Sequence, residues 1–160
     1  NDKTFIKAFI RETSRKGISL LWHKSSSRDA FQSPIESKAF LEFGCLQDED
    51  KLFNEPRLAW YDDEDQLLGK IELVAIKSLE NPSPQQLNDF PFAIPGNTLI
   101  LKVHRSSEDL VFETYNREAS ARFIHGLRWV VARLTFNLII GNTDVSCELV
   151  ELPDDSPSSR

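Results

Sequence analysis

Residues whose side chains could serve catalysis are scattered along the 160-residue chain. Carboxylates gather at 48–50 and in the run D-D-E-D at 62–65, and both runs are typical of solvated turns. A glycosidase pair or a metal site would instead need inward-facing carboxylates set by the fold. The three histidines, His23, His104 and His125, fall in three different expected elements. With no G-x-S-x-G elbow and no glycine-rich phosphate loop, the sequence predicts a domain without catalysis, cofactor or metal.

The two cysteines and the apolar runs bear on the compartment. Cys45 and Cys147 lie far apart in sequence, which favours reduced, partly buried thiols, and they are too few for a zinc site. No apolar run approaches the ~20 residues of a membrane span, and residues 5–10 lack a signal-peptide cleavage site. We expect a cytoplasmic protein, with a peripheral position at a membrane as the alternative. Because the chain begins at Asn1 and contains no Met, we expect one domain of a longer protein.

The net charge of −6 is unevenly distributed. Residues 1–28 carry seven Lys or Arg against Asp2 and Glu12, a net +5, so the remainder carries −11. This acidic bulk argues against nucleic-acid binding, which depends on neutralising phosphates. The basic end suits an anionic membrane surface, and it also fits a solvated charged segment.

The element that positions the rest is a helix expected over 116–138, the only long segment with a clean helical period. Asn116 suits the N-cap, and Gly141 supplies a stop. One apolar stripe comprises Ala119, Phe123, Leu127, Val130, Leu134 and Leu138. His125, Trp129 and Phe136 fall on the opposite face, so this helix needs a cover on both sides.

Residues 2–16 predict a short amphipathic helix that ends at Gly17, with a strand as the alternative. Phe5, Ile6, Phe9 and Ile10 share one face of this helix. We expect Phe5 and Phe9 to pack on the face of the long helix formed by His125, Trp129 and Phe136. A membrane surface or a partner protein is the alternative cover for either apolar face.

Between the two helices the pattern is one of strands. Strands are expected at 18–24, 38–46, 57–61, 69–79 (one strand with a bend or bulge), and in a hairpin at 98–105 and 110–115. The proline-rich connection 81–97 has room for one helical turn at 85–88. Residues 145–152 read as a further strand or a docked extension, and the last residues as a disordered tail or linker.

Strands followed by one helix, with no βαβ rhythm, predict a mainly β, α+β fold with an antiparallel sheet. Over about 17–138 the chain resembles the pleckstrin homology (PH) family, most closely in texture the PH domains of phosphoinositide-specific phospholipase C. The segments that carry the resemblance are K-G-I-S-L-L-W-H-K, R-L-A-W-Y, G-K-I-E-L-V-A-I and A-S-A-R-F-I-H-G-L-R-W-V-V. It implies a seven-stranded antiparallel barrel or orthogonal sandwich capped by the long C-terminal helix. The expected divisions are a docked helix at 1–16, the PH-like domain at 17–140, and an extension at 141–160.

The resemblance also implies a phosphate clamp around the loop between the first two strands. The residues that would form it are His23, Lys24, Arg28, Lys38 and Arg57, with Phe31 at the loop tip for membrane contact. The family motif has a second basic residue two positions after the first on the second strand, whereas here Lys38 is followed by Phe40 and then Glu42. The acidic turn at 62–65 repels a polyphosphate, by about 1 kcal/mol per carboxylate at surface dielectric.

Two functions follow from these expectations. The first is a non-catalytic scaffolding module that binds another protein, or another domain of the parent chain. The alternative is a membrane-targeting domain that binds phosphoinositides or anionic lipids weakly through the loop between the first two strands.

Overall fold

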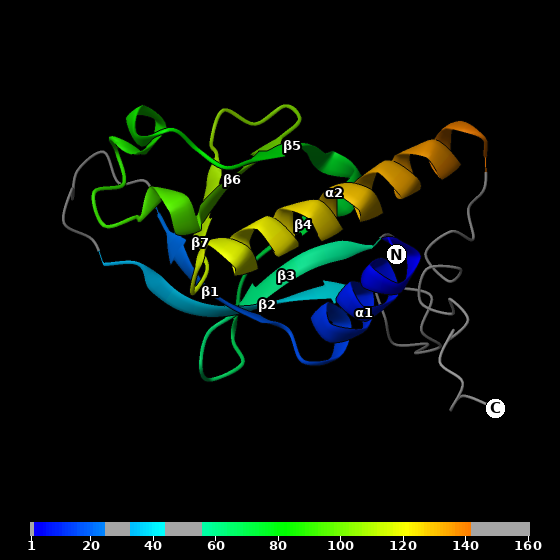
Figure 1. Cartoon of the computed structure of the whole chain (residues 1–160), viewed down its shortest axis with the longest axis horizontal. Helices are drawn as coiled ribbons and strands as arrows, with labels where there is room; N and C mark the ends of the chain where they lie inside the picture. Colours follow the sequence, from blue (N-terminus) through cyan, green and yellow to red (C-terminus); the bar gives the residue numbers. More distant parts are fainter. Residues whose placement is uncertain (1, 25–32, 44–55, 142–160) are drawn as a thin grey trace.

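The computed structural model describes residues 2–24, 33–43 and 56–141. Within these ranges two α-helices flank seven strands (Figure 1). The elements are α1 (Asp2–Arg15), β1 (Ile18–His23), β2 (Ile35–Glu42), β3 (Arg57–Tyr61), β4 (Leu67–Glu72), β5 (Ile76–Glu80), β6 (Thr98–Val103), β7 (Leu110–Glu113) and α2 (Arg117–Ile139). Short 3-10 helices lie at η1 (Leu73–Ala75), η2 (Pro84–Leu87) and η3 (Pro95–Asn97). The turn expected at 85–88 is therefore present as η2.

The seven strands form one antiparallel sheet in the order β4-β3-β2-β1-β7-β6-β5. β1 lies at its centre, paired to β2 through Ile18↔Ala39 and to β7 through Trp22↔Phe112. The sheet is curved, and α2 lies across it (Figure 1). This is the expected architecture of seven antiparallel strands with one long C-terminal helix.

The segment expected as one bent strand at 69–79 is instead two strands, so that prediction was wrong. β4 and β5 stand at opposite edges of the sheet, and η1 carries the chain between them. Leu73 is fully buried in this corner, and its N–H donates to the carbonyl of Pro56 at 3.0 Å. Apolar corner residues resemble strand residues in sequence, which is why the corner looked like a bulge. Residues 145–152 and both cysteines lie outside the described part of the chain.

One apolar core joins both helices to the inner face of the sheet. From α2 it takes the predicted stripe of Phe123, Leu127, Val130 and Leu134. From α1 it takes Ile6, Phe9 and Ile10, and from the sheet residues that include Leu20, Leu41, Trp60 and Phe112. Because α1 supplies buried core residues, it is part of the packed domain rather than an appendage.

The ends of both helices follow the capping residues expected from sequence. Gly17, at φ +75°, ends α1, and its N–H donates to the carbonyl of Glu12 at 3.0 Å. Asn116 caps α2, since its Oδ1 accepts from the N–H of Ala119 at 2.8 Å. None of the helices in the described ranges combines the length and the apolarity that crossing a bilayer demands.

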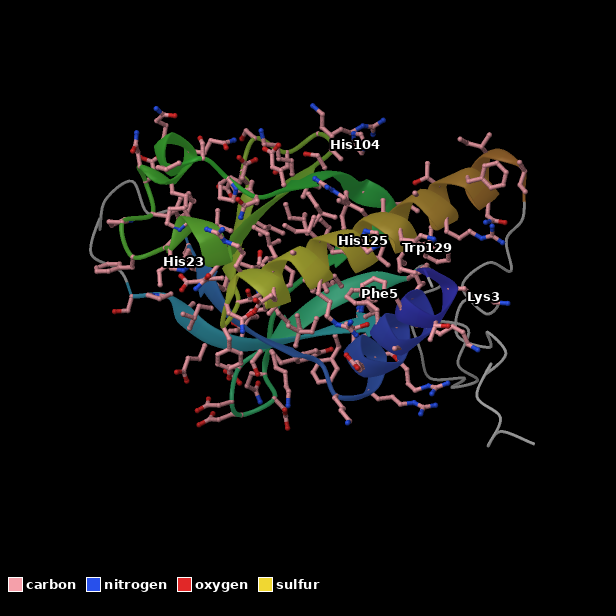
Figure 2. The ribbon with its side chains drawn as sticks, in the orientation of Figure 1. Lys3, Phe5, His23, His104, His125 and Trp129 are labelled. Atoms are coloured by element: carbon pink, nitrogen blue, oxygen red, sulfur yellow. The ribbon has the colours of Figure 1, made fainter. Side chains whose placement is uncertain are left out.

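The two helices meet through aromatic side chains. The ring centroids of Phe5 and His125 are 5.0 Å apart (Figure 2), and those of Phe9 and Phe123 are 6.2 Å apart. Gly126 lies under Phe9, so close that a Cβ there would stand 2.6 Å from three ring atoms. Arg122 of α2 also reaches Glu12 of α1, with Nη2 to Oε2 at 3.1 Å.

The far end of the predicted second face of α2 has no such cover. Trp129 is partly buried against the core, whereas Phe136 is 55% exposed. The expectation that α1 covers Phe136 was therefore wrong. α1 meets α2 around Gly126, and ten residues of helix place Phe136 about 15 Å further along the axis.

Candidate functional site

His23, expected to contact a phosphate, is instead committed to a buried pair. Its side chain is only 4% exposed, and Nε2 lies 2.9 Å from Oε1 of Glu113 on the neighbouring strand β7. The backbone N–H of Ile94 donates to the same oxygen at 3.3 Å. The ring is enclosed and Nε2 is already bonded to a carboxylate, so a phosphate would have to displace Glu113, and the phosphate contact of His23 stays a prediction.

Arg57 is also held away from the expected clamp. Its Nε donates to Oε1 of Glu42 at 2.7 Å, and the Tyr61 hydroxyl donates to Oε2 of the same carboxylate at 2.5 Å. Burial, reinforced by the bond to Glu42, raises the pKa of Tyr61 to about 12. Arg57 faces Glu42, four residues or about 13 Å along β2 from Lys38. Arg57 is therefore engaged by Glu42 at a distance from Lys38, and its place in a phosphate clamp stays a prediction.

The remaining expected cations are exposed or outside the described ranges. Lys24 is exposed, with Nζ 4.8 Å from the ring centroid of Trp22, and Lys38 is exposed on the outer face of β2. Arg28 and Phe31 lie outside the described residues. The clamp around the first loop thus stays a prediction that rests on Lys24, Arg28 and Lys38.

The outer face of the sheet carries a hollow of about 630 Å³ beside Lys38. We call it the acidic groove. It lies over β1, β2 and β7 and extends to the β3–β4 turn and to η3. Among the described residues, the charged ones that line it are Glu36, Asp62, Asp63, Asp65, Glu113 and Lys38. Five carboxylates against one amine give this groove a formal charge of −4.

Local structure fixes the carboxylates of the groove. Oδ1 of Asp62 accepts from the backbone N–H groups of Glu64 and Gln66, both at 2.9 Å, which holds the β3–β4 turn closed. Asp63 and Asp65 are left exposed on this turn. At the other side Glu113 is buried, with Oε1 bonded to His23 and Ile94, while Oε2 accepts no hydrogen bond from the described residues. The second oxygen of this carboxylate therefore remains available to the groove.

Apolar side chains form the rim of the same groove. Tyr115 is 82% exposed and Ile94 is 53% exposed, and both line it together with Leu21 of β1. An acidic base with an apolar and aromatic rim suits a lysine or arginine side chain, whose stem packs on apolar surface while its head meets carboxylates. The same carboxylates repel a polyphosphate.

The sequence pattern indicated part of this groove, but only as a segment that repels phosphate. The acidic run at 62–65 predicts repulsion of phosphate. The sequence pattern did not indicate that Glu113, Ile94 and Tyr115 belong to a binding site. The available hint was Glu113 itself, a carboxylate between Phe112 and Thr114 in an otherwise apolar strand. The histidines, as expected, lie apart from one another: His23, His104 and His125 occupy separate regions in Figure 2.

No protein-family model and no curated protein matches this sequence. Solved structures do. The Inner Membrane Complex sub-compartment protein 1 of Toxoplasma gondii is similar with a TM-score of 0.54 and 14% identity, over 80% of this chain and 91% of that one. The C-terminal PH domain of human pleckstrin is similar with a TM-score of 0.50 and 12% identity, over 74% and 92%. The expected PH-like fold is therefore confirmed.

A third structure, L. pealei PLC21, matches with a TM-score of 0.47 and 14% identity, over 74% of this chain and 15% of that one. That score is too low to support an argument. The expected likeness to phospholipase C PH domains therefore stays a prediction.

Proposed function

We propose that this PH-like domain is a non-catalytic interaction module that binds a basic segment of another protein, or of another domain of its parent chain. The observation that carries the proposal is the acidic groove, where five carboxylates surround one lysine beside exposed Tyr115 and Ile94. A basic peptide would place a cationic head near Oε2 of Glu113 and Asp63, and an apolar side chain on the rim.

The lipid alternative has less support. Of the five residues expected to hold phosphate, His23 and Arg57 are bonded to carboxylates, and Lys38 shares the acidic groove with five carboxylates. Lys24 and the cations of α1 still offer a diffuse attraction to an anionic surface. Such attraction would be weak, sensitive to salt and indifferent to the head group.

The test is fluorescence anisotropy with two labelled peptides of equal length. One alternates Lys with Leu, and the other has Glu in place of each Lys. We expect saturable binding of the basic peptide alone, weakened about tenfold by the double variant Asp63→Asn with Asp65→Asn. The matched control is Glu108→Gln with Asp109→Asn, which removes two exposed carboxylates outside the groove. Equal binding of both peptides, or equal weakening by both double variants, would contradict the proposal.

Liposome co-sedimentation, with and without phosphoinositides and at low and physiological salt, tests the alternative. If the domain does not sediment with liposomes at low salt or at physiological salt, lipid binding is excluded. If sedimentation is strong and requires phosphoinositide, and the domain does not bind the basic peptide, lipid binding becomes the better supported function.

A further inference from the structure

A second hollow, of about 530 Å³, lies along α2 and has the opposite charge character. We call it the basic pocket. α2 forms one wall, and Asn81 and Gly96, which flank the connection between β5 and β6, contribute to the other. Its α2 residues include Arg117, Ser120 and Arg128, which fall at helical spacing on one face. None of the described residues that line this pocket is acidic.

The two arginines of the basic pocket are positioned differently. Arg128 is anchored, because its Nε donates to the carbonyl of Leu79 at 2.8 Å and its Nη2 donates to the same oxygen. Arg117 is exposed and makes no ion pair with any described residue. It passes close to the backbone at Gly96, where a Cβ would stand 3.1 Å from Nη2. The absence of a side chain at Gly96 therefore gives the guanidinium of Arg117 its place beside the pocket.

Ser120 supplies the independent observation. It is 1% exposed and lines the basic pocket, and its Oγ has no hydrogen-bond partner among the described residues. A buried hydroxyl without a partner is unfavourable, and in native proteins such groups are nearly always bonded to a protein group, an ordered water or a bound ligand. The amide of Asn81 and the ring of His125 add further polar groups around the same hollow.

We propose that the basic pocket binds a phosphate monoester group of a small molecule or a lipid head group. Two guanidinium groups match the charge of a phosphate dianion, and their planar donors match its oxygens. The Ser120 hydroxyl adds a donor from the buried side. The volume lies in the range of small-molecule sites rather than of extended peptide grooves. This site is separate from the acidic groove and from the cations expected around the first loop, so either proposal can fail alone.

The test is an amide chemical-shift titration of the ¹⁵N-labelled domain with glycerol 3-phosphate, at constant ionic strength. We expect saturable shifts at residues 81, 96, 117, 120, 125 and 128. Arg117→Gln should weaken binding about tenfold, which corresponds to about 1.4 kcal/mol. Ser120→Ala should weaken it several-fold while the domain stays folded. The control is Arg11→Gln, which removes an exposed arginine of α1 outside the pocket.

A parallel arm identifies the source of the phosphate. Phosphatidylcholine vesicles with and without phosphatidic acid present the same monoester on a bilayer. Sedimentation that needs phosphatidic acid and is lost in Arg117→Gln supports a lipid source, whereas a response to glycerol 3-phosphate alone supports a soluble one. The proposal is overturned if neither probe gives saturable shifts at these residues, or if Arg11→Gln and Arg117→Gln weaken binding equally.

Discussion

The contact between Phe9 and Gly126 allows a quantitative test of how α1 is held. Replacing Gly126 by Ala adds one methyl group within a helix, which by itself stabilises a helix by about 0.5–1 kcal/mol. Here the new Cβ would lie 2.6 Å from Cγ, Cδ1 and Cδ2 of Phe9, about 1 Å inside ordinary contact distance. These atoms belong to the base of a rigid ring in the core, so the helices must move apart.

The magnitude follows from two opposing terms. Overpacking a well-filled core costs about 1–3 kcal/mol, which exceeds the gain in helix propensity. We expect Gly126→Ala to lower the free energy of unfolding by about 0.5–2 kcal/mol. Phe9→Ala should cost about 3–5 kcal/mol, because Phe9 is fully buried. In that background the ring is gone, so Gly126→Ala should become stabilising by about 0.5–1 kcal/mol.

The assay is urea unfolding of the wild type, both single variants and the double variant, followed by circular dichroism. The double-mutant cycle isolates the coupling between the two positions, expected at about 1–3 kcal/mol. Phe9→Val provides a milder background if Phe9→Ala leaves too little stability to measure. The reasoning is refuted if Gly126→Ala has the same effect with and without the Phe9 ring.

Three further predictions concern the sheet and α2. Tyr61 has a folded pKa near 12 against an ordinary value near 10, so the stability it gives is complete below pH 10 and is lost as the pH rises toward 12. The free energy of unfolding obtained from urea titrations across this range should fall by about 1–2 kcal/mol more in the wild type than in Tyr61→Phe, since the partial exposure of the ring reduces the full effect. Parallel curves for the two proteins would contradict this. Gly69→Ala should destabilise by about 1–3 kcal/mol, because its Cβ would stand 2.3 Å from the Trp60 indole, and thermal unfolding at unchanged Tm would disprove the clash. Leu127→Ala, at a fully buried position, should cost about 2–5 kcal/mol in the same assay, and a loss below 1 kcal/mol would show that α2 does not fill the core as described.

The helices could be predicted from sequence because their pattern is local. Periods of three and four residues, together with Asn116 and Gly17 as end signals, placed both helices within about two residues of their observed bounds. The corner at η1 could not be found in the same way. Leu73 is buried there by contact with distant residues, and its apolar side chain looks the same in a strand and in a corner.

The charged residues were harder to place, because their partners are set by strand register. His23 meets Glu113, which lies 90 residues away, only because β1 pairs with β7. Arg57 meets Glu42 across β2 and β3 in the same way. Residue type alone indicated phosphate-binding side chains, whereas pairing in three dimensions bonded His23 to Glu113 and Arg57 to Glu42. The acidic groove emerged from that same arrangement of strands.

The contact of α1 with α2 also determines when the domain can be completed during synthesis. Glu12 and Arg122, which bridge the two helices, are 110 residues apart. At 5–20 residues per second, α1 is made about 5–20 s before the part of α2 that it packs against. Through that interval Phe9 on the nascent helix lacks Phe123 and Gly126, its partners on α2. Docking of α1 against α2 therefore belongs to the last stage of folding, after the ribosome has completed α2.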